Sequence, residues 1–450
     1  MRAVASPSTE RFLELKRRAL VARARRLVRL TPEAVGLRPR DLRFAPSPSH
    51  FAAAQGRLTA IDQRIRARLA RLDRIVRSAD PPTAEDLLLA MAMVEREVDR
   101  ARRAFGMFFE IFAQRGTAFA PALAAHDAIA ADCYRAVREG LPGVFEGPIL
   151  KPLTYMEHGY SPATMRRGVS LARLLGDSNP FPLIRIPYDR DRPWQAVFLH
   201  EVAHNLMADL GIWLETREAV IVRLHEAGLP LRVIAIYGRW HKEIFADLAA
   251  LLLGGPAAAY GMAEFLAHPA DRVMTYRPGG PHPVGYLRIL LLAEMLRRMR
   301  FAREAEDLSG IWGSLYDPRR GHRMPAVLLA TRGRAIAAVV DEIAFQPRRN
   351  LAQRALASVI RFTADDQRAI RRAAFDLAAG RPPGGLPPRH MPAACRYALN
   401  AGADSRRLAF LVTELLAQGG TGWSNERLAR AGPLPATARS ARSEPVLLPA

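Results

Sequence analysis

The stretch Phe198-Leu-His-Glu-Val-Ala-His-Asn205 decides how this chain of 450 residues is interpreted. Residues four apart lie on one face of a helix, so His200 and His204 can present imidazole nitrogens to the same metal ion. Glu201 lies about 100° further round the helix, because one turn takes ~3.6 residues. That offset places its carboxylate beside a metal-bound water rather than among the ligands. The spacing is the one that zinc-dependent hydrolysis requires, with Glu201 as the general base.

The residues around this motif are apolar on nearly every side of the predicted helix: Val197, Phe198, Leu199, Val202, Ala203, Leu206 and Met207. A helix that is apolar all round is buried. Two histidines and a glutamate inside a buried helix need partners, and a metal supplies them. A surface helix that carries the three residues by chance is the competing interpretation, and the flanks oppose it. We expect the helix to begin at Asp191-Arg-Pro193 and to end near Leu210.

A second predicted helix, over about 231–253, offers the missing ligand. Glu243 and Asp247 are four residues apart on one face, and their neighbours are apolar. Buried carboxylates are costly unless they are paired or bound to a metal. We therefore predict that Glu243 is the third zinc ligand and that Asp247 accepts a hydrogen bond from a histidine N–H. A solvated acidic face is the alternative, and it fits the apolar surroundings poorly.

Together, His200-Glu-Val-Ala-His204 and Glu243-Ile-Phe-Ala-Asp247 resemble the signature of the gluzincin zinc metallopeptidases, the thermolysin and neprilysin type. The motifs are separated by 38 residues. The resemblance implies a zincin-like metallopeptidase core and one zinc ion per chain, bound by His200, His204 and Glu243. It also implies that Glu201 is the general base and that Asp247 orients His200.

The gluzincin resemblance covers about a quarter of the chain, over residues 181–300, and no subfamily is indicated. It further implies that the short apolar segment 181–187 is an edge strand, on which a peptide substrate would align by adding as a further strand. A second short strand is expected within 148–156. Both segments are bounded by prolines, which is typical of strands in a small sheet with an exposed edge.

A third element is Pro281-His-Pro-Val-Gly-Tyr-Leu-Arg-Ile289. It resembles the His-Pro-x-x-x-x-Arg-Ile segment that follows the zinc helices in CAAX prenyl-protease-like zinc peptidases. A histidine held between prolines at a helix start could donate a hydrogen bond to the developing oxyanion, so His282 is predicted as a second catalytic residue. Tyr286, Arg288 and the more distant Tyr237 are other candidate donors. A plain helix-terminal turn with an arginine salt bridge is the alternative.

The composition bounds the class of protein. With 49% hydrophobic residues, the chain can bury a large core or several ordinary ones, which excludes a disordered or collagen-like protein. The net charge of +22 invites a nucleic-acid partner. However, the only lysines are Lys16, Lys151 and Lys242, and the wealth of arginine with alanine, proline and glycine indicates a codon bias. The charge is therefore weak evidence for a partner.

The location expected from the sequence is cytoplasmic. No stretch reaches the roughly 18 to 20 apolar residues of a membrane span, and the N-terminus lacks the apolar region of a signal peptide. The two cysteines, Cys133 and Cys395, cannot form a disulfide framework for a chain of this length.

The fold class expected is mainly α (α+β), with a zincin-like core and a small edge-exposed sheet flanked by helical bundles. The predicted divisions are an N-terminal helical domain, the metallopeptidase domain, a C-terminal helical domain and a disordered tail, over residues 1–142, 143–320, 321–424 and 425–450. In the first domain, an apolar stripe at helical spacing runs from Leu58 to Val76, and Thr83 with Asp86 is typical of a helix cap. In the third, helices are expected over 324–345, 349–362, 363–379 and 393–417.

The function expected is hydrolysis of peptide bonds by a zinc metallopeptidase, acting on a peptide or protein substrate. Two other classes stay open. One is a non-catalytic interaction protein that retains a zinc site, although an intact Glu201 is more than a structural site needs. The other is an arginine-rich nucleic-acid binder with the segments 11–29 and 57–77 as its footprint, which requires those arginines on one continuous face. Codon bias and solvated helix faces explain these arginines more simply. The sequence does not indicate an oligomeric state.

Overall fold

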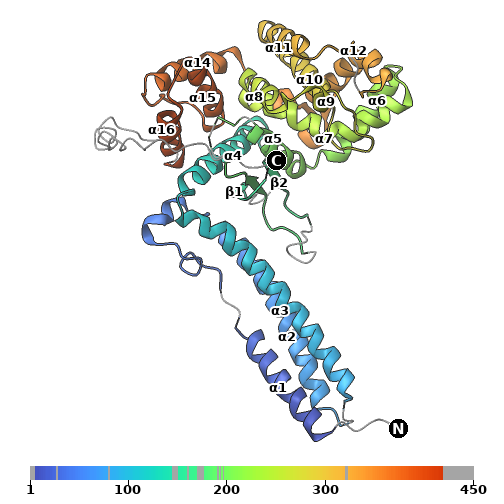
Figure 1. The fold of residues 1–450 in the computed structure, drawn as a ribbon, viewed down its shortest axis with the longest axis vertical. Helices are drawn as coiled ribbons and strands as arrows, with labels where there is room; N and C mark the ends of the chain where they lie inside the picture. The colour runs from blue at the N-terminus through green and yellow to red at the C-terminus, as the bar shows by residue number, and fades with distance from the viewer. Residues whose placement is uncertain are drawn as a thin grey trace, which may run out of the picture.

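The computed structural model describes residues 6–26, 29–79, 82–143, 150–159, 162–169, 177–189, 192, 194–195, 197–319 and 323–418. The described chain is mainly helical and carries a small sheet (Figure 1). The tail predicted over 425–450 lies outside the described residues. Among the helices that the structure describes, none combines the length and the apolar character needed to cross a membrane.

The N-terminal helices form a long arm that projects from the rest of the molecule (Figure 1). The arm consists of α1 (Pro7–Ala24), α2 (Pro48–Val76) and α3 (Ala84–Ala113). The predicted stripe is largely confirmed, because Leu58, Ile61, Ile65 and Leu72 of α2 are buried against the neighbouring helices, whereas Val76 is exposed. The predicted cap of α3 is confirmed too: the hydroxyl of Thr83 accepts from the backbone N–H of Asp86, whose carboxylate accepts from the N–H of Thr83.

A three-stranded sheet joins this arm to the larger core. Its strands are β1 (Leu153–Met156), β2 (Ala163–Met165) and β3 (Leu183–Ile186). The side chains of successive residues in a strand point to opposite faces of the sheet. Here one face packs into the hydrophobic core of the arm and the other into the larger core. Leu153, Tyr155 and Leu183 pack with the arm, whereas Met156, Ile184 and Ile186 pack with the larger core. The sheet is therefore the structural connection between the arm and the larger core.

The order of the strands corrects one expectation. The segment 181–187 was expected to be an edge strand, but β3 lies in the middle of the sheet, parallel to β1 on one side and antiparallel to β2 on the other. The edge that contacts the helix α5 (Val197–Asp209) is β2. The reason is topological: β3 comes last in the chain but inserts between the two earlier strands, and the apolar pattern of a short segment does not specify its neighbours in space.

Helices α5 to α12 form the central part of the larger core. They are α5 (Val197–Asp209), α6 (Trp213–Glu226), α7 (Leu231–Gly254), α8 (Pro256–Leu266), α9 (Ala270–Val273), α10 (Gly285–Arg298), α11 (Ala302–Leu315) and α12 (Ala326–Val340). Helix α5 is described from Val197, whereas the start predicted at 191–193 lies partly outside the described residues; residues 192, 194 and 195, which are described, are not helical. Arg192 and Gln195 instead form a turn, in which the N–H of Gln195 donates to the carbonyl of Arg192 over 3.2 Å.

The C-terminal part differs from the sequence-based expectation in two places. The helix predicted over 349–362 is a short β4 (Pro347–Arg348) and β5 (Arg354–Ala355) pair followed by the single turn α13 (Leu356–Val359). The helix predicted over 393–417 is divided into α15 (Met391–Asn400) and α16 (Ser405–Ala417), and the Asp404 side chain caps α16. Both breaks depend on local backbone turns, with positive φ at Ala352, Gln353 and Gly402.

Two helices remain to be placed. They are α4 (Ala120–Gly140) and α14 (Ala364–Ala378). Helix α16 packs on α4, and α15 packs on both α14 and α8. Helix α4 falls in the predicted N-terminal domain, yet its buried side chains belong to the larger core together with α5 and α7.

Candidate metal centre

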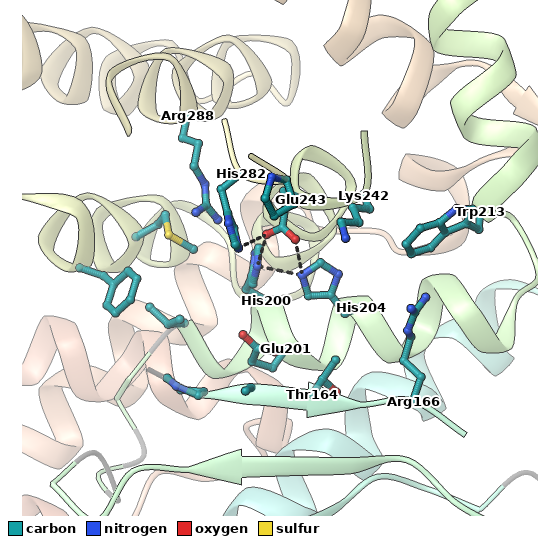
Figure 2. A pocket seen from close by; sticks show the side chains of 16 residues that line it. Thr164, Arg166, His200, Glu201, His204, Trp213, Lys242, Glu243, His282 and Arg288 are labelled. Atoms are coloured by element: carbon teal, nitrogen blue, oxygen red, sulfur yellow. Dashed lines mark hydrogen bonds and ion pairs between the residues drawn. The ribbon is translucent and has the colours of Figure 1, made fainter. Parts of the chain in front are cut away.

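Two packed helices bring the predicted ligands together. His200 and His204 lie on α5, Glu243 lies on α7, and their side chains converge between the two helices (Figure 2). The Nε2 atoms of His200 and His204 are 3.1 Å apart. The Glu243 carboxylate lies 3.4 Å from His200 Nε2 through Oε2 and 3.5 Å from His204 Nε2 through Oε1. These three residues form a group able to bind one metal ion.

The spacing of the three donor atoms suits a tetrahedral ion. In a tetrahedral zinc site, nitrogen and oxygen ligands lie ~2.0–2.2 Å from the metal, which places any two of them roughly 3.3 Å apart. The two Nε2 atoms are 3.1 Å apart, and the distances from His200 to Glu243 Oε2 and from His204 to Glu243 Oε1 are 3.4 and 3.5 Å, so both carboxylate oxygens lie close to that value from one histidine. Glu243 Oε2 also has no hydrogen-bond partner among the described residues although it is buried. The donor set of two imidazoles and one carboxylate is a known catalytic zinc set.

Two buried charged side chains, Asp247 and Arg288, lie behind the ligand His200. They belong to different sequence motifs, so neither motif alone predicts their contact. His200 Nδ1, on the side of the ring away from the other ligands, is 2.8 Å from Asp247 Oδ1. Arg288 of α10 then donates to both oxygens of Asp247, from Nε and Nη2, each over 2.7 Å. Asp247 and Arg288 are 2% and 6% exposed. The ring of His200 is thus held from behind by a carboxylate that is itself held by a bidentate guanidinium.

The electrostatics of these groups follow from burial and close partners. Burial opposes the charged form of His200, but the charge of Asp247 outweighs it and raises the histidine pKa to about 9. Burial likewise opposes ionised Glu243, yet the contacts with His200 and His204 hold its pKa well below the usual range. Burial also opposes the ionised form of Asp247, but the positive charge of Arg288 outweighs this effect and lowers the pKa of Asp247.

The buried charges of the centre do not balance when its histidines are neutral, which is the form in which histidine binds a metal. Glu201, Glu243 and Asp247 are three buried carboxylates, and Arg288 is the buried cation beside them. With neutral histidines and all three carboxylates ionised, the group carries a formal charge of −2. Uncompensated charge in a protein interior is strongly unfavourable. A divalent cation between the histidines and Glu243 would compensate it.

Glu201 faces the same space from α5 without joining the three donors. Figure 2 shows its carboxylate below His200 and His204, between them and β2. The side chain is 9% exposed. Burial raises its pKa to about 7, against the lowering effect of His200. A carboxyl group with a pKa near neutrality can both accept and release a proton at that pH.

A cavity of about 420 Å³ opens over the centre. It is lined by His200, Glu201, His204 and Glu243 together with Thr164 of β2 and His282. The amide of Asn205, the residue after the second histidine, donates to the hydroxyl of Thr164 over 2.6 Å. This bond fixes the edge strand against the motif helix, and the sequence offered no sign of it.

His282 reaches the centre from the turn before α10. Its Nε2 atom lies 3.5 Å from Glu243 Oε2, and its side chain is 63% exposed. The structure therefore brings together all six residues predicted for the site: His200, Glu201, His204, Glu243, Asp247 and His282. Arg288 is occupied by Asp247, and neither Tyr286 nor Tyr237 is among the described residues that line the cavity.

The arginines behind the nucleic-acid alternative do not share one environment. Arg57 donates to Ser178, and Arg64 pairs with Glu97 and Asp177, so both are engaged within the fold. Arg66 pairs with Asp62 one turn away on the exposed side of α2. Arg68, Arg71 and Arg74 line a separate groove at the outer part of the arm.

Comparison of the chain with models of protein families, with curated proteins and with solved structures gives no match.

Proposed function

We propose that the protein is a zinc-dependent metallopeptidase with a zincin-like core. The observation that carries the proposal is the shared cavity: it is lined by the three candidate ligands, by a separate buried carboxylate and by an edge strand. A structural metal site needs only ligands. Glu201, beside the ligands but not among them, is the additional group that hydrolysis requires.

The fit of the donor set to zinc defines what the metal contributes: when bound, zinc acidifies water and polarises a carbonyl oxygen. Glu201 accepts the proton of the attacking water and passes it to the leaving amine, for which its pKa of about 7 is suited. His282 donates to the carbonyl oxygen as negative charge develops there.

The other residues act by holding these groups in position. Asp247 fixes the tautomer and the orientation of His200, and Arg288 fixes Asp247. The edge strand β2 offers backbone groups to an extended peptide, which would add to the sheet above Glu201. This assigns to β2 the role that the sequence had placed on the segment 181–187.

The proposal is tested with the full chain loaded with one equivalent of zinc and a mixture of blocked peptides, with cleavage followed by mass spectrometry. Wild type should cut peptides, lose this activity on chelation and regain it with zinc. Glu201→Gln should keep its zinc and helical content but lose about 10²–10⁴-fold in rate, because the amide cannot accept the proton. Cleavage by Glu201→Gln at the wild-type rate would contradict the mechanism. Zinc-loaded wild type that cuts nothing would favour the non-catalytic alternative.

A further inference from the structure

One end of the cavity carries two cations beside one indole ring. Arg166 follows directly after β2, Lys242 precedes the ligand Glu243 on α7, and Trp213 begins α6. The guanidinium carbon of Arg166 lies 4.5 Å from the centre of the Trp213 ring, and Lys242 Nζ lies 5.5 Å from it. Figure 2 shows these three side chains together beyond His204, on the side away from His200 and His282.

The Trp213 ring positions both cations. Neither Arg166 nor Lys242 forms an ion pair with a carboxylate in the described part of the chain, and both are only half-buried. In contrast, Arg288, the other cation that lines the cavity, has its donors occupied by Asp247. A guanidinium stacked on an aromatic face keeps the N–H groups at its edge available. Stacking therefore orders Arg166 without using its hydrogen-bonding capacity.

We propose that Arg166 and Lys242 form the specificity site of this peptidase and bind a carboxylate of the substrate. The inference rests on the proposed function, since it takes an extended peptide as the ligand. A planar guanidinium matches a carboxylate in two hydrogen bonds, and the ammonium group of Lys242 supplies a second charge. The site is rigidly related to the metal centre, because Lys242 is adjacent to a ligand and Arg166 continues the edge strand.

The direction of β2 assigns the acidic residue to one side of the cleaved bond. The strand runs from Ala163 to Met165, so Arg166 lies at its carboxyl end. Antiparallel pairing is slightly more stable per residue than parallel pairing. A peptide added antiparallel to β2 has its N-terminal part beside Arg166. The preferred substrates therefore carry aspartate or glutamate on the N-terminal side of the bond that is cut.

The test measures binding and cleavage separately, with N-acetylated and C-amidated octapeptides that carry a single Glu, or Gln in its place, at each position in turn. Binding is measured on zinc-loaded Glu201→Gln protein, and the cut bond is located with wild type. Arg166→Ala and Lys242→Gln are each introduced into both proteins. Arg232→Ala is the matched control, because it removes one exposed charge from α7 away from the cavity.

The expected result is tighter binding of the Glu peptide than of its Gln partner when the residue is N-terminal to the cut bond. This preference should fall about tenfold in each cavity variant, the usual effect of losing a hydrogen bond to a charged group, and should stay in Arg232→Ala. The inference would be overturned if the Glu and Gln peptides bound equally well, or if the Glu preference survived in both cavity variants. It would also be overturned if the preferred Glu lay on the C-terminal side of the cut bond. A Glu preference in binding that falls in both cavity variants, together with no cleavage by wild type, would contradict the proposed function and leave the carboxylate-binding role of Arg166 and Lys242 supported.

Discussion

The arm and the metal centre are built from similar helices but bury different side chains. Of the described residues in α1, α2 and α3, the buried polar ones are His50 and Glu97. Each has nearby partners, since His50 contacts Ser47 and the carbonyl of Lys151, and Glu97 pairs with Arg64 and Arg100. On α5, α7 and α10 the buried polar side chains are far more numerous: His200, Glu201, Asn205, His241, Glu243, Asp247 and Arg288.

The difference separates a region that apolar packing explains from a region that buries many polar side chains. Apolar side chains at helical spacing account for the arm. Buried charges, in contrast, cost stability unless each is well paired. Their concentration on three packed helices, around three residues that could hold a metal ion, is the reason we propose that the centre binds a cation. Substitutions in the two regions should therefore have different consequences.

After Glu201→Gln, the largest effect is expected at His282, on the exposed side of the centre. His282→Ala should keep its zinc and a near-normal KM but lose about 10²–10³-fold in kcat, the usual cost of losing an oxyanion donor. Peptide cleavage kinetics and metal analysis on the same preparation check this. An unchanged kcat would remove His282 from the mechanism, and loss of zinc would make it a ligand instead.

A smaller effect is expected from removing the carboxylate behind His200. Asp247→Ala and Asp247→Asn should weaken zinc binding by about 10–100-fold, because His200 loses the group that orients it. Competition with a chelator measures this. The matched change in the arm is Glu97→Ala, which also removes a buried carboxylate with arginine partners. It should lower the stability of the arm and leave zinc affinity unchanged. Equal zinc affinity in the Asp247 and Glu97 variants would remove the distinction between the two regions.

The smallest effect is expected at an exposed ion pair of the arm. Arg66 is 78% exposed and pairs with Asp62 one turn earlier on α2. Such pairs contribute ~0.3–0.5 kcal/mol, so Arg66→Ala should change the free energy of unfolding by no more than about 0.5 kcal/mol. Chemical denaturation followed by circular dichroism measures the change. A loss above about 2 kcal/mol would mean that the arm depends on its surface charges more than on its apolar stripe.

The sequence predicts those parts of the molecule that depend on neighbours along the chain. The pairs at positions 200 and 204 and at 243 and 247 follow from helical spacing, and the stripe of α2 and the cap of α3 follow from local patterns. The grouping of Glu243, Asp247 and His282 with the two histidines was expected only from the resemblance to known families, and other contacts between distant parts of the chain were missed. Arg288 contacts Asp247 across 41 residues, and β3 inserts between two earlier strands. No periodicity marks such pairings.

The grouping of Arg166, Trp213 and Lys242 was missed for the same reason. These residues come from a strand end and from two different helices, so no spacing along the chain relates them. Lys242 is nevertheless one of only three lysines in an arginine-rich chain, and it stands next to a predicted metal ligand. That position was the one signal in the sequence that could have indicated the site.

The central claim, that His200, His204 and Glu243 bind a catalytic zinc ion, is tested most directly by elemental analysis of the purified full chain. Wild type should contain one zinc per chain. Glu243→Ala should contain little after dialysis, because two histidines alone leave the site one protein ligand short. Glu97→Ala is the control for losing a buried glutamate elsewhere, and it should retain one zinc per chain. Wild type without zinc after incubation with the metal, or full zinc in Glu243→Ala, would contradict the account.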